Sequence, residues 1–237
     1  MVDNKLNVVG NGFLGNKFKK YNSFLKKKKL IIYVAGVSNS NEKNLKNLKR
    51  DINKLYQFIK NNKKNKIIYI SSCSIFDPNR KKSLYLRNKL KIEKLIKKNC
   101  NDYIIIRLPE IVGKNKNKYT LTNYFYNKIN NSLPFTLYIN SKRNILDVDD
   151  AVKLIFHFLK KKTKLKYLNI ANIKFINPKK IIEIMEQIVN KKAKYIISKK
   201  KLINWSINNN VNSDLLKKTK IKIGKDYLNK ILSKYYK

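Results

Sequence analysis

Tyr85, Lys89 and Glu93 follow one another at four-residue steps, in a stretch whose pattern is typical of a helix. Residues four apart lie on one face of a helix with Cβ atoms about 6 Å apart, so the Lys89 ammonium is expected beside the Tyr85 phenol. A neighbouring cation lowers the pKa of a tyrosine, which could then exchange a proton with a sugar hydroxyl or ketone near neutral pH. Ser72, at the end of an apolar run just upstream, could orient the same oxygen. The alternative is a solvated helix that carries a tyrosine and a lysine by chance.

A glycine-rich segment follows the first apolar run, Leu6–Val9, and precedes a helical pattern that contains Phe18 and Phe24. It has the pattern GxGxxG and consists of Gly10, Asn11, Gly12, Phe13, Leu14 and Gly15. Glycines at these positions allow a tight turn, a close approach of the backbone to a pyrophosphate, and close packing of helix on strand. Glycine also serves ordinary turns, but the position of this segment between a strand and a helix favours phosphate binding.

The acidic residue that usually accompanies such a loop is missing. A dinucleotide-binding unit has Asp or Glu about 20 residues after the glycines, at the end of a second strand, where it holds the adenosine ribose. In this chain the next strand begins at Leu30, about 15 residues after Gly15, and continues to Ala35 without an acidic end. This interval predicts one helix and a short basic turn, and no ribose carboxylate.

Apolar runs alternate with helical patterns along most of the chain, which is typical of an α/β fold with a parallel sheet covered by helices. The expected strands are Leu6–Val9, Leu30–Ala35, Lys66–Ser71 and Tyr103–Leu108. A helix with apolar residues at steps of three and four, from Leu45 to Ile59, lies between the second and third. From about residue 121 the pattern is mixed. The expected elements there are helices over 121–132, 149–160 and 178–189 and extended segments over 135–139, 144–146 and 167–170.

The formal net charge of +42 and the pI of about 10.2 would ordinarily indicate binding to nucleic acid or to an anionic membrane surface. Arginine, whose fork best holds bases and phosphates, is rare, so nearly all of the 56 basic residues are lysines. They are spread over every segment and gather on no single tail or face, as an AT-rich genome would produce whatever the function. We therefore expect no specific nucleic-acid partner.

No apolar run reaches the roughly 18 residues of a membrane span, and the N-terminus leaves no room for a secretory signal, so we expect a cytoplasmic protein. Cys73 and Cys100 are too few for a disulfide framework, and their spacing is unlike that of metal ligands. We expect no metal site.

Together these motifs resemble the extended short-chain dehydrogenase/reductase family, the NAD-dependent epimerase/dehydratase group that remodels nucleotide sugars. Gly12–Gly15 is similar to the family's GFxG turn. Ala35 and Gly36 resemble the small-residue turn that borders the cofactor. The segment Ser71–Phe76 is similar to the one that carries the family's catalytic Ser or Thr, and the alignment implies this role for Ser72.

The resemblance continues into the second half of the chain. Tyr85 and Lys89 match the family's acid/base pair, with Glu93 as the usual acidic residue one turn later. Arg107–Gly113, with Leu108 and Pro109, resembles the segment that passes the nicotinamide. Arg143, followed by the acidic segment 147–150, resembles the region whose arginine meets the substrate's pyrophosphate, and 167–171 is similar to the small C-terminal substrate domain.

The resemblance implies a Rossmann-like parallel sheet that lacks the family's second and third strands, with a small C-terminal α+β substrate region. The expected boundaries are 1–120 for the nucleotide-binding domain and 121–237 for the substrate region, interleaved with the sheet. The sheet would then begin at its first strand as an exposed edge. The short interval between Ser72 and Tyr85 implies a trimmed loop over the substrate.

The implied function is that of an NAD(P)-dependent epimerase, dehydratase or reductase that acts on a nucleotide-activated sugar, for surface polysaccharide synthesis. NAD or NADP would be the cofactor, and a homodimer is one possible assembly. A second hypothesis is a non-catalytic sugar-nucleotide binding protein that kept the fold and lost the cofactor. A nucleic-acid binder has only the bulk charge in its favour.

Overall fold

The computed structural model describes residues 7–161 and 164–237, which group into two compact units. The first unit ends at Leu108 and also includes Ile155–Ile170, and the second comprises Pro109–Leu154 and Ala171–Lys237. Whereas the sequence placed one boundary near residue 120, the chain leaves the first unit after Leu108 and returns to it at Ile155. Among the described residues no helix is both long enough and apolar enough to cross a bilayer.

A five-stranded parallel sheet forms the centre of the first unit, in the order β1-β2-β3-β4-β8. The strands are β1 (Val8–Val9), β2 (Leu30–Tyr33), β3 (Lys66–Ser72), β4 (Tyr103–Leu108) and β8 (Tyr167–Asn169). The three central strands are rich in isoleucine and buried along nearly their whole length, as in parallel sheets covered on both faces. The α/β prediction is confirmed, and the strands lie within two residues of the expected bounds, apart from Leu6, which falls outside the described residues.

The first strand forms one edge of this sheet. In the part of the chain that the structure describes, β1 pairs only with β2, through Val8 opposite Ile32 and Val9 opposite Tyr33. The prediction of a sheet that begins at its first strand is therefore confirmed. The lysines of the 26–29 run lead directly into β2, next to this edge.

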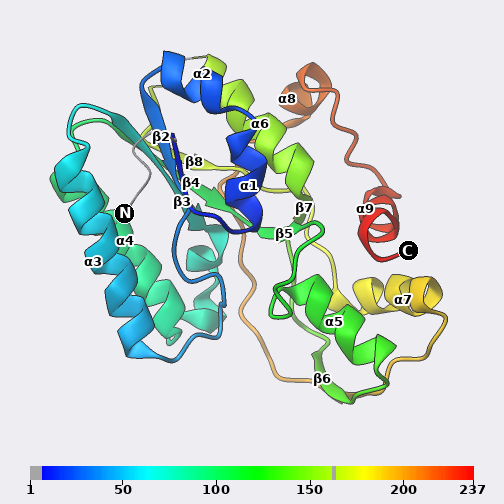
Figure 1. Cartoon of the computed structure of the whole chain (residues 1–237). Coiled ribbons are helices and arrows are strands. Elements are labelled where there is room, and N and C mark those ends of the chain that lie inside the picture. Colours follow the sequence, from blue (N-terminus) through cyan, green and yellow to red (C-terminus); the bar gives the residue numbers. More distant parts are fainter. Residues whose placement is uncertain (1–6, 162–163) are drawn as a thin grey trace. The chain divides into compact units, whose positions relative to one another are not determined.

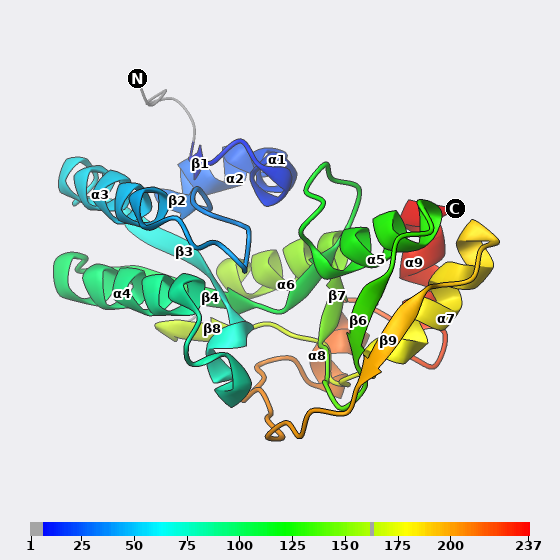
Figure 2. The same ribbon diagram turned by 90° about the horizontal axis from the view of Figure 1, so that it is seen from below.

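Two long helices cover one face of the sheet, α3 (Leu45–Asn61) and α4 (Leu84–Asn99), which lie side by side in Figures 1 and 2. The apolar residues of α3 recur every three or four positions, and those that point to the sheet are buried. The core on this face contains residues from both helices and from three strands: Leu55, Ile59, Ile92, Ile96, Tyr33, Ile67, Tyr69, Tyr103 and Ile105.

Two short helices, α1 (Phe13–Lys19) and α2 (Asn22–Lys27), lie on the opposite face, together with the C-terminal half of α6 (Val148–Lys160) (Figure 2). The sequence predicted a single helix before β2, and this prediction is wrong. The chain turns between the two helices, so that Tyr21 stacks on Phe156 with ring centroids 3.8 Å apart while Phe24 meets the same ring edge-on.

The second unit contains two small parallel sheets and four further helices. β5 (Glu110–Val112) pairs with β7 (Ile145–Asp147), and β6 (Phe135–Tyr138) pairs with β9 (Tyr195–Ser198). The helices are α5 (Leu121–Asn130), α7 (Pro178–Val189), α8 (Ser213–Lys218) and α9 (Tyr227–Tyr236). The segment around 167–170 was expected in this region, but β8 pairs with β4 in the main sheet.

Candidate active site

The predicted phosphate loop lies at the carboxyl end of β1, and its three glycines have different surroundings. Gly10 has a φ of +131°, and a Cβ there would approach the Ala35 nitrogen to 2.9 Å. A Cβ on Gly15 would collide with the carbonyl oxygen of Gly10. Around Gly12, in contrast, no heavy atom lies within 4 Å of the Cβ position. Gly10 and Gly15 are thus required by packing, whereas Gly12 leaves open space beside the backbone, as the approach of a phosphate requires.

The remaining loop residues complete this turn. Phe13 and Leu14 form the first turn of α1, and the Asn11 Oδ1 atom accepts a hydrogen bond from the Lys19 ammonium at 2.9 Å. The Lys19 ammonium is therefore held beside the glycine loop.

The predicted Ala35-Gly36 turn follows β2 and is held by a carboxylate that the sequence analysis did not single out. Gly36 has a φ of +131°, and the Val37 N–H donates a hydrogen bond to Asp51 Oδ2 at 2.5 Å. Asp51 lies on α3 and is only 6% exposed. A signal was present, since Asp51 falls between the buried Leu48 and Leu55 on the apolar face of an otherwise basic helix.

Ser72 and Tyr85 meet at the carboxyl end of β3. Ser72 is the last residue of this strand, and its hydroxyl accepts the Ser74 N–H at 3.1 Å, so it begins the short 3-10 helix Cys73–Phe76. Tyr85 lies in the first turn of α4, next to a second 3-10 turn, Pro78–Arg80. Burial raises the pKa of Tyr85 to about 12, although Arg80 and a hydrogen bond with Ser72 act in the opposite direction. The expected lowering of this pKa is therefore wrong for the structure described here.

The Lys89 ammonium, the cation that was expected to lower the pKa of Tyr85, is hydrogen-bonded to another residue. It donates a hydrogen bond to the hydroxyl of Tyr69, on β3, at 3.0 Å, and lies 5.1 Å from the centroid of the Tyr69 ring and 5.6 Å from that of Tyr85. Burial lowers the pKa of Lys89 to about 8, while the charges of Asp51 and Glu93 raise it. The four-residue spacing correctly predicted that Lys89 lies near Tyr85, but the Lys89 ammonium donates its hydrogen bond to Tyr69.

A buried ion pair fixes α4 against the sheet. Arg107 on β4 contacts Glu93 through two hydrogen bonds, Nη2 to Oε2 at 2.6 Å and Nε to Oε1 at 3.1 Å. The Ser71 hydroxyl donates to the same Glu93 Oε1 atom at 2.6 Å. Three hydrogen bonds from two residues satisfy this buried carboxylate and hold it in one orientation. Glu93 thus positions the helix that carries Tyr85 and Lys89.

Leu108 and Pro109 follow this arginine. Leu108 ends β4 opposite Ser72 in the strand register and is 3% exposed, and Pro109 begins the second unit. The glycine loop, the Ala35-Gly36 turn, Ser72 and Leu108 thus all stand at the carboxyl ends of neighbouring parallel strands, the edge at which open α/β sheets bind ligands.

Arg143 belongs to the second unit. Its backbone pairs with that of Ile176, and its Nη1 atom lies 3.3 Å from Glu110 Oε1. The buried Nε atom has no hydrogen-bond partner among the described residues. One donor of the guanidinium group therefore remains for a further acceptor.

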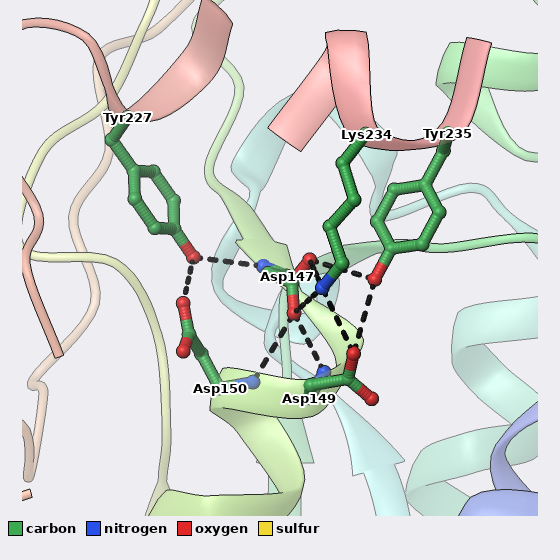
Figure 3. Close-up of polar contacts among 6 residues, drawn as sticks. All are labelled: Asp147, Asp149, Asp150, Tyr227, Lys234 and Tyr235. Atoms are coloured by element: carbon green, nitrogen blue, oxygen red, sulfur yellow. Dashed lines mark hydrogen bonds and ion pairs between the residues drawn. The ribbon is translucent and has the colours of Figure 1, made fainter. Parts of the chain in front are cut away.

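The acidic segment that follows Arg143 is occupied by the C-terminal helix, as Figure 3 shows. Lys234 lies 3.2 Å from Asp147 and 2.9 Å from Asp149, and the Tyr235 hydroxyl donates to Asp147 at 2.8 Å. The Tyr227 hydroxyl donates to Asp150 Oδ2 at 2.8 Å, and burial raises the pKa of that carboxyl group. These carboxylates anchor α9. No group of His, Cys, Asp and Glu within 7–161 and 164–237 has the arrangement of a metal site.

A family model and several solved structures match the chain. The model of the NAD dependent epimerase/dehydratase family matches residues 23–173, which begin after the glycine loop. A comparison with curated proteins returned no match.

Solved structures of low sequence identity share the fold. UDP-glucuronic acid 4-epimerase from Bacillus cereus, in complex with UDP-glucuronic acid and NAD, has a TM-score of 0.69 and 18% identity over 90% of this chain and 76% of its own. RMD from Pseudomonas aeruginosa, complexed with NADPH, has a TM-score of 0.67 and 16% identity over 95% of this chain and 97% of its own. dTDP-glucose 4,6-dehydratase from Bacillus anthracis, in complex with NAD, has a TM-score of 0.66 and 14% identity over 92% of this chain and 75% of its own.

Proposed function

Because the chain belongs to the NAD-dependent epimerase/dehydratase family, we propose that it is an NAD(P)-dependent epimerase, dehydratase or reductase that acts on a nucleotide-activated sugar. The observation that carries the proposal is the group of Ser72, Tyr85 and Lys89 at one end of the sheet. A hydroxyl, a phenol and an ammonium at this place can bind and protonate a sugar oxygen. A role in surface polysaccharide synthesis and assembly as a homodimer are parts of the same proposal and rest on the resemblance alone.

The residues present fit the pyrophosphate and nicotinamide parts of a dinucleotide. The open space at Gly12 and the loop around it would hold the pyrophosphate, and Ala35, Gly36, Leu108 and Pro109 would border the cofactor along the strand ends. A bound nicotinamide would accept a hydride from a sugar carbon or return one to it. Arg143 would contact the diphosphate of the substrate, since one of its buried donors has no partner among the described residues.

The chain's own groups would divide the proton chemistry as follows. With a pKa of about 12, Tyr85 is protonated at neutral pH and donates its proton to a sugar oxygen held by Ser72. Transfer in the opposite direction requires the phenolate, which a cation stabilises. Lys89 lies over both rings, so its ammonium can leave the Tyr69 hydroxyl and approach Tyr85 by rotation of its own side chain.

The test is binding followed by turnover. Purified protein is titrated with NADH and NADPH, and then incubated with a panel of UDP- and dTDP-sugars and analysed for epimerised, dehydrated or reduced product. Tyr85→Phe should bind the cofactor normally and lose roughly a hundredfold or more in turnover. Tyr56→Phe, on the basic helix α3, is the matched control and should keep full activity. Wild-type turnover in Tyr85→Phe would refute the assigned role.

A second candidate function is favoured by the edge of the sheet. No strand lies outside β1 among the described residues, and no Asp or Glu ends β2, so the usual adenosine contacts are absent there. A protein that binds sugar nucleotides without a dinucleotide would have this structure. It would bind a UDP-sugar while showing no saturable binding of NADH or NADPH, and this outcome decides between the two functions.

A further inference from the structure

The sides of α3 and α4 that point away from the sheet carry basic side chains and no exposed carboxylate. The two helices lie side by side on one face of the sheet and bury their apolar residues against it (Figures 1 and 2). Basic residues are spread over the whole sequence, but folding brings these two segments together. Ten exposed basic residues, five on each helix, form what we call the basic face: Lys46, Lys49, Arg50, Lys54, Lys60, Arg87, Lys91, Lys94, Lys97 and Lys98.

Helical spacing explains why these side chains share one side of each helix. On α4 the residues Arg87, Lys91, Lys94 and Lys98 follow one another at steps of four and three, which places them in a single stripe. This stripe lies opposite Ile96, which is fully buried. Like charges at these steps repel one another and destabilise a helix, so the free protein gains no stability from the arrangement.

The acidic residues of the two helices do not neutralise the basic face. Asp51 on α3 and Glu93 on α4 are their only carboxylates, and they are 6% and 5% exposed. Both are already bound on the inner side, Glu93 by Arg107 and Asp51 by the Val37 N–H. Among the described residues, Arg50 is the one member of the basic face with an ion pair, at 3.7 Å from Asp51.

α7 and α9 show that a high net charge does not by itself exclude carboxylates from the surroundings of an exposed lysine. On α7, Lys180 lies 3.4 Å from Glu183, one turn further along the helix. On α9, Lys234 lies 3.2 Å from Asp147 and 2.9 Å from Asp149. The basic face lacks such pairs, so its charge remains available to an anionic partner.

The shape and composition of the basic face match an anionic lipid surface. Each helix is about 25 Å long, and packed helices lie about 8–10 Å apart, so together they present a broad, flat area. Eight of its ten basic residues are lysines, which attract headgroup phosphates as point charges without a fixed geometry. Leu45 and Leu90, on the same helices, are 56% and 41% exposed, and apolar side chains can insert between lipid headgroups.

Two other partners fit less well. Nucleic acid is read by arginine forks and, in single strands, by exposed aromatic rings. The basic face has only two arginines, and none of the aromatic residues of α3 and α4 is exposed. A second copy of the chain would bring the same positive charge against this face, which opposes association.

We propose that the basic face of α3 and α4 binds the surface of a lipid bilayer that contains anionic headgroups. The attraction is electrostatic and is shared among many lysines, so it weakens as salt is added. It requires neither a dinucleotide nor a sugar nucleotide, and its test is therefore independent of the proposed function.

The experiment measures sedimentation of the full chain with lipid vesicles. One set contains phosphatidylcholine alone, and the other also contains about 30% phosphatidylglycerol, which supplies the negative surface potential. In the test variant, Lys91→Glu, Lys94→Glu and Lys98→Glu are combined. The matched control replaces the three exposed lysines at 26–28 with glutamate, which reverses the same number of charges at α2, on the opposite face of the sheet. Urea unfolding confirms that each variant is folded.

We expect the wild type to bind the vesicles with phosphatidylglycerol and not those of phosphatidylcholine alone. The affinity of the test variant should fall by at least about tenfold, and that of the control by no more than about threefold. Raising the salt concentration from 0.1 M to about 1 M should abolish binding, because the Debye length falls from about 10 Å to about 3 Å. If the test variant does not fold, glutamine replaces glutamate at the same three positions.

Three results would overturn the proposal. Equal losses in the two variants would show that the bulk charge binds the vesicles, and equal binding to both kinds of vesicle would show that the anionic headgroups are not needed. A test variant that keeps vesicle binding but loses binding to a DNA duplex of about 20 base pairs would assign the basic face to nucleic acid.

Discussion

Gly12 and Gly15 belong to one loop but have different neighbours, so replacing each with alanine separates folding from ligand binding. A methyl group on Gly15 would meet backbone atoms of Gly10, including the carbonyl carbon at 2.8 Å. A methyl group on Gly12 would have no heavy atom within 4 Å. We expect Gly15→Ala to weaken folding and Gly12→Ala to weaken cofactor binding.

The expected magnitudes follow from these contacts. Backbone cannot move aside as a flexible side chain does, so the collision at Gly15 should destabilise the fold by about 1–3 kcal/mol, as overpacking does. Alanine in place of glycine inside α1 returns at most about 1 kcal/mol, so a net loss of up to about 2 kcal/mol remains. Gly12 caps α1 with a φ of −78°, which alanine readily adopts. The poorer cap should cost about 0.5 kcal/mol or less.

The assay combines urea unfolding with quenching of NADPH fluorescence. Gly12→Ala should unfold like the wild type and bind NADPH at least about tenfold more weakly, a loss of about 1.4 kcal/mol, because the methyl group fills the space for a phosphate. Gly224→Ala, in the second unit and with no heavy atom within 4 Å, is the control and should change neither property. Wild-type affinity in Gly12→Ala would refute the placement of the pyrophosphate, and wild-type stability in Gly15→Ala would refute the packing argument.

Three further predictions concern two ion pairs and the pH dependence of stability. Glu93→Gln should lower the free energy of unfolding in urea by about 3–5 kcal/mol, because Arg107 loses its buried partner; a loss below about 1 kcal/mol would contradict this. Lys234→Met should cost about 1 kcal/mol, since Lys234 is half exposed while Asp147 is buried, and unchanged stability would show that the C-terminal helix does not depend on this pair. The stability of the wild type relative to Lys89→Met should rise with pH between about 8 and 10.5. The pKa of Lys89 is lowered in the folded protein, which therefore binds fewer protons in this range than the unfolded chain does. A stability difference that stays constant with pH in thermal scans would contradict this sign.

The fifth prediction concerns the choice between NADH and NADPH. No Asp or Glu ends β2 to reject a 2′-phosphate, so we expect affinities for NADH and NADPH to be similar, with a slight preference for NADPH. A strong preference for NADH in parallel titrations would contradict it.

Where local spacing determines the geometry, the sequence correctly predicted which residues lie close together. Four-residue steps on α4 placed Tyr85 and Lys89 close together, and the apolar runs gave the strands whose carboxyl ends carry Ser72 and the glycine loop. It could not predict the hydrogen bond from Lys89 to Tyr69, because this contact depends on how α4 packs over β3. For the same reason the pKa of Tyr85 was predicted in the wrong direction, since burial outweighs a cation that is bonded elsewhere.

The contacts of the C-terminal helix could not be predicted from the sequence either. A helical pattern was present, because Leu228, Ile231 and Leu232 recur at steps of three and four. Its contacts with the acidic segment, however, join residues about 80 positions apart in the chain. Local periodicity contains no information about such pairs, and a run of carboxylates looks the same in sequence whether it faces a ligand or a lysine of its own chain.

The edge of the sheet and the proposed catalytic groups are physically separable in this fold. The adenosine half of a dinucleotide site depends on strands outside the first one, whereas Ser72, Tyr85 and Lys89 are positioned by β3 and α4 and by the Glu93–Arg107 ion pair. A sheet that begins at β1 can therefore lose adenosine contacts without disturbing the groups that would handle the sugar proton. β1 has only two paired residues, and short, charge-flanked edge strands resist pairing with other chains. Because the affected contacts are those to adenosine, the shortened sheet should weaken cofactor affinity and discrimination before it affects the chemistry of Tyr85.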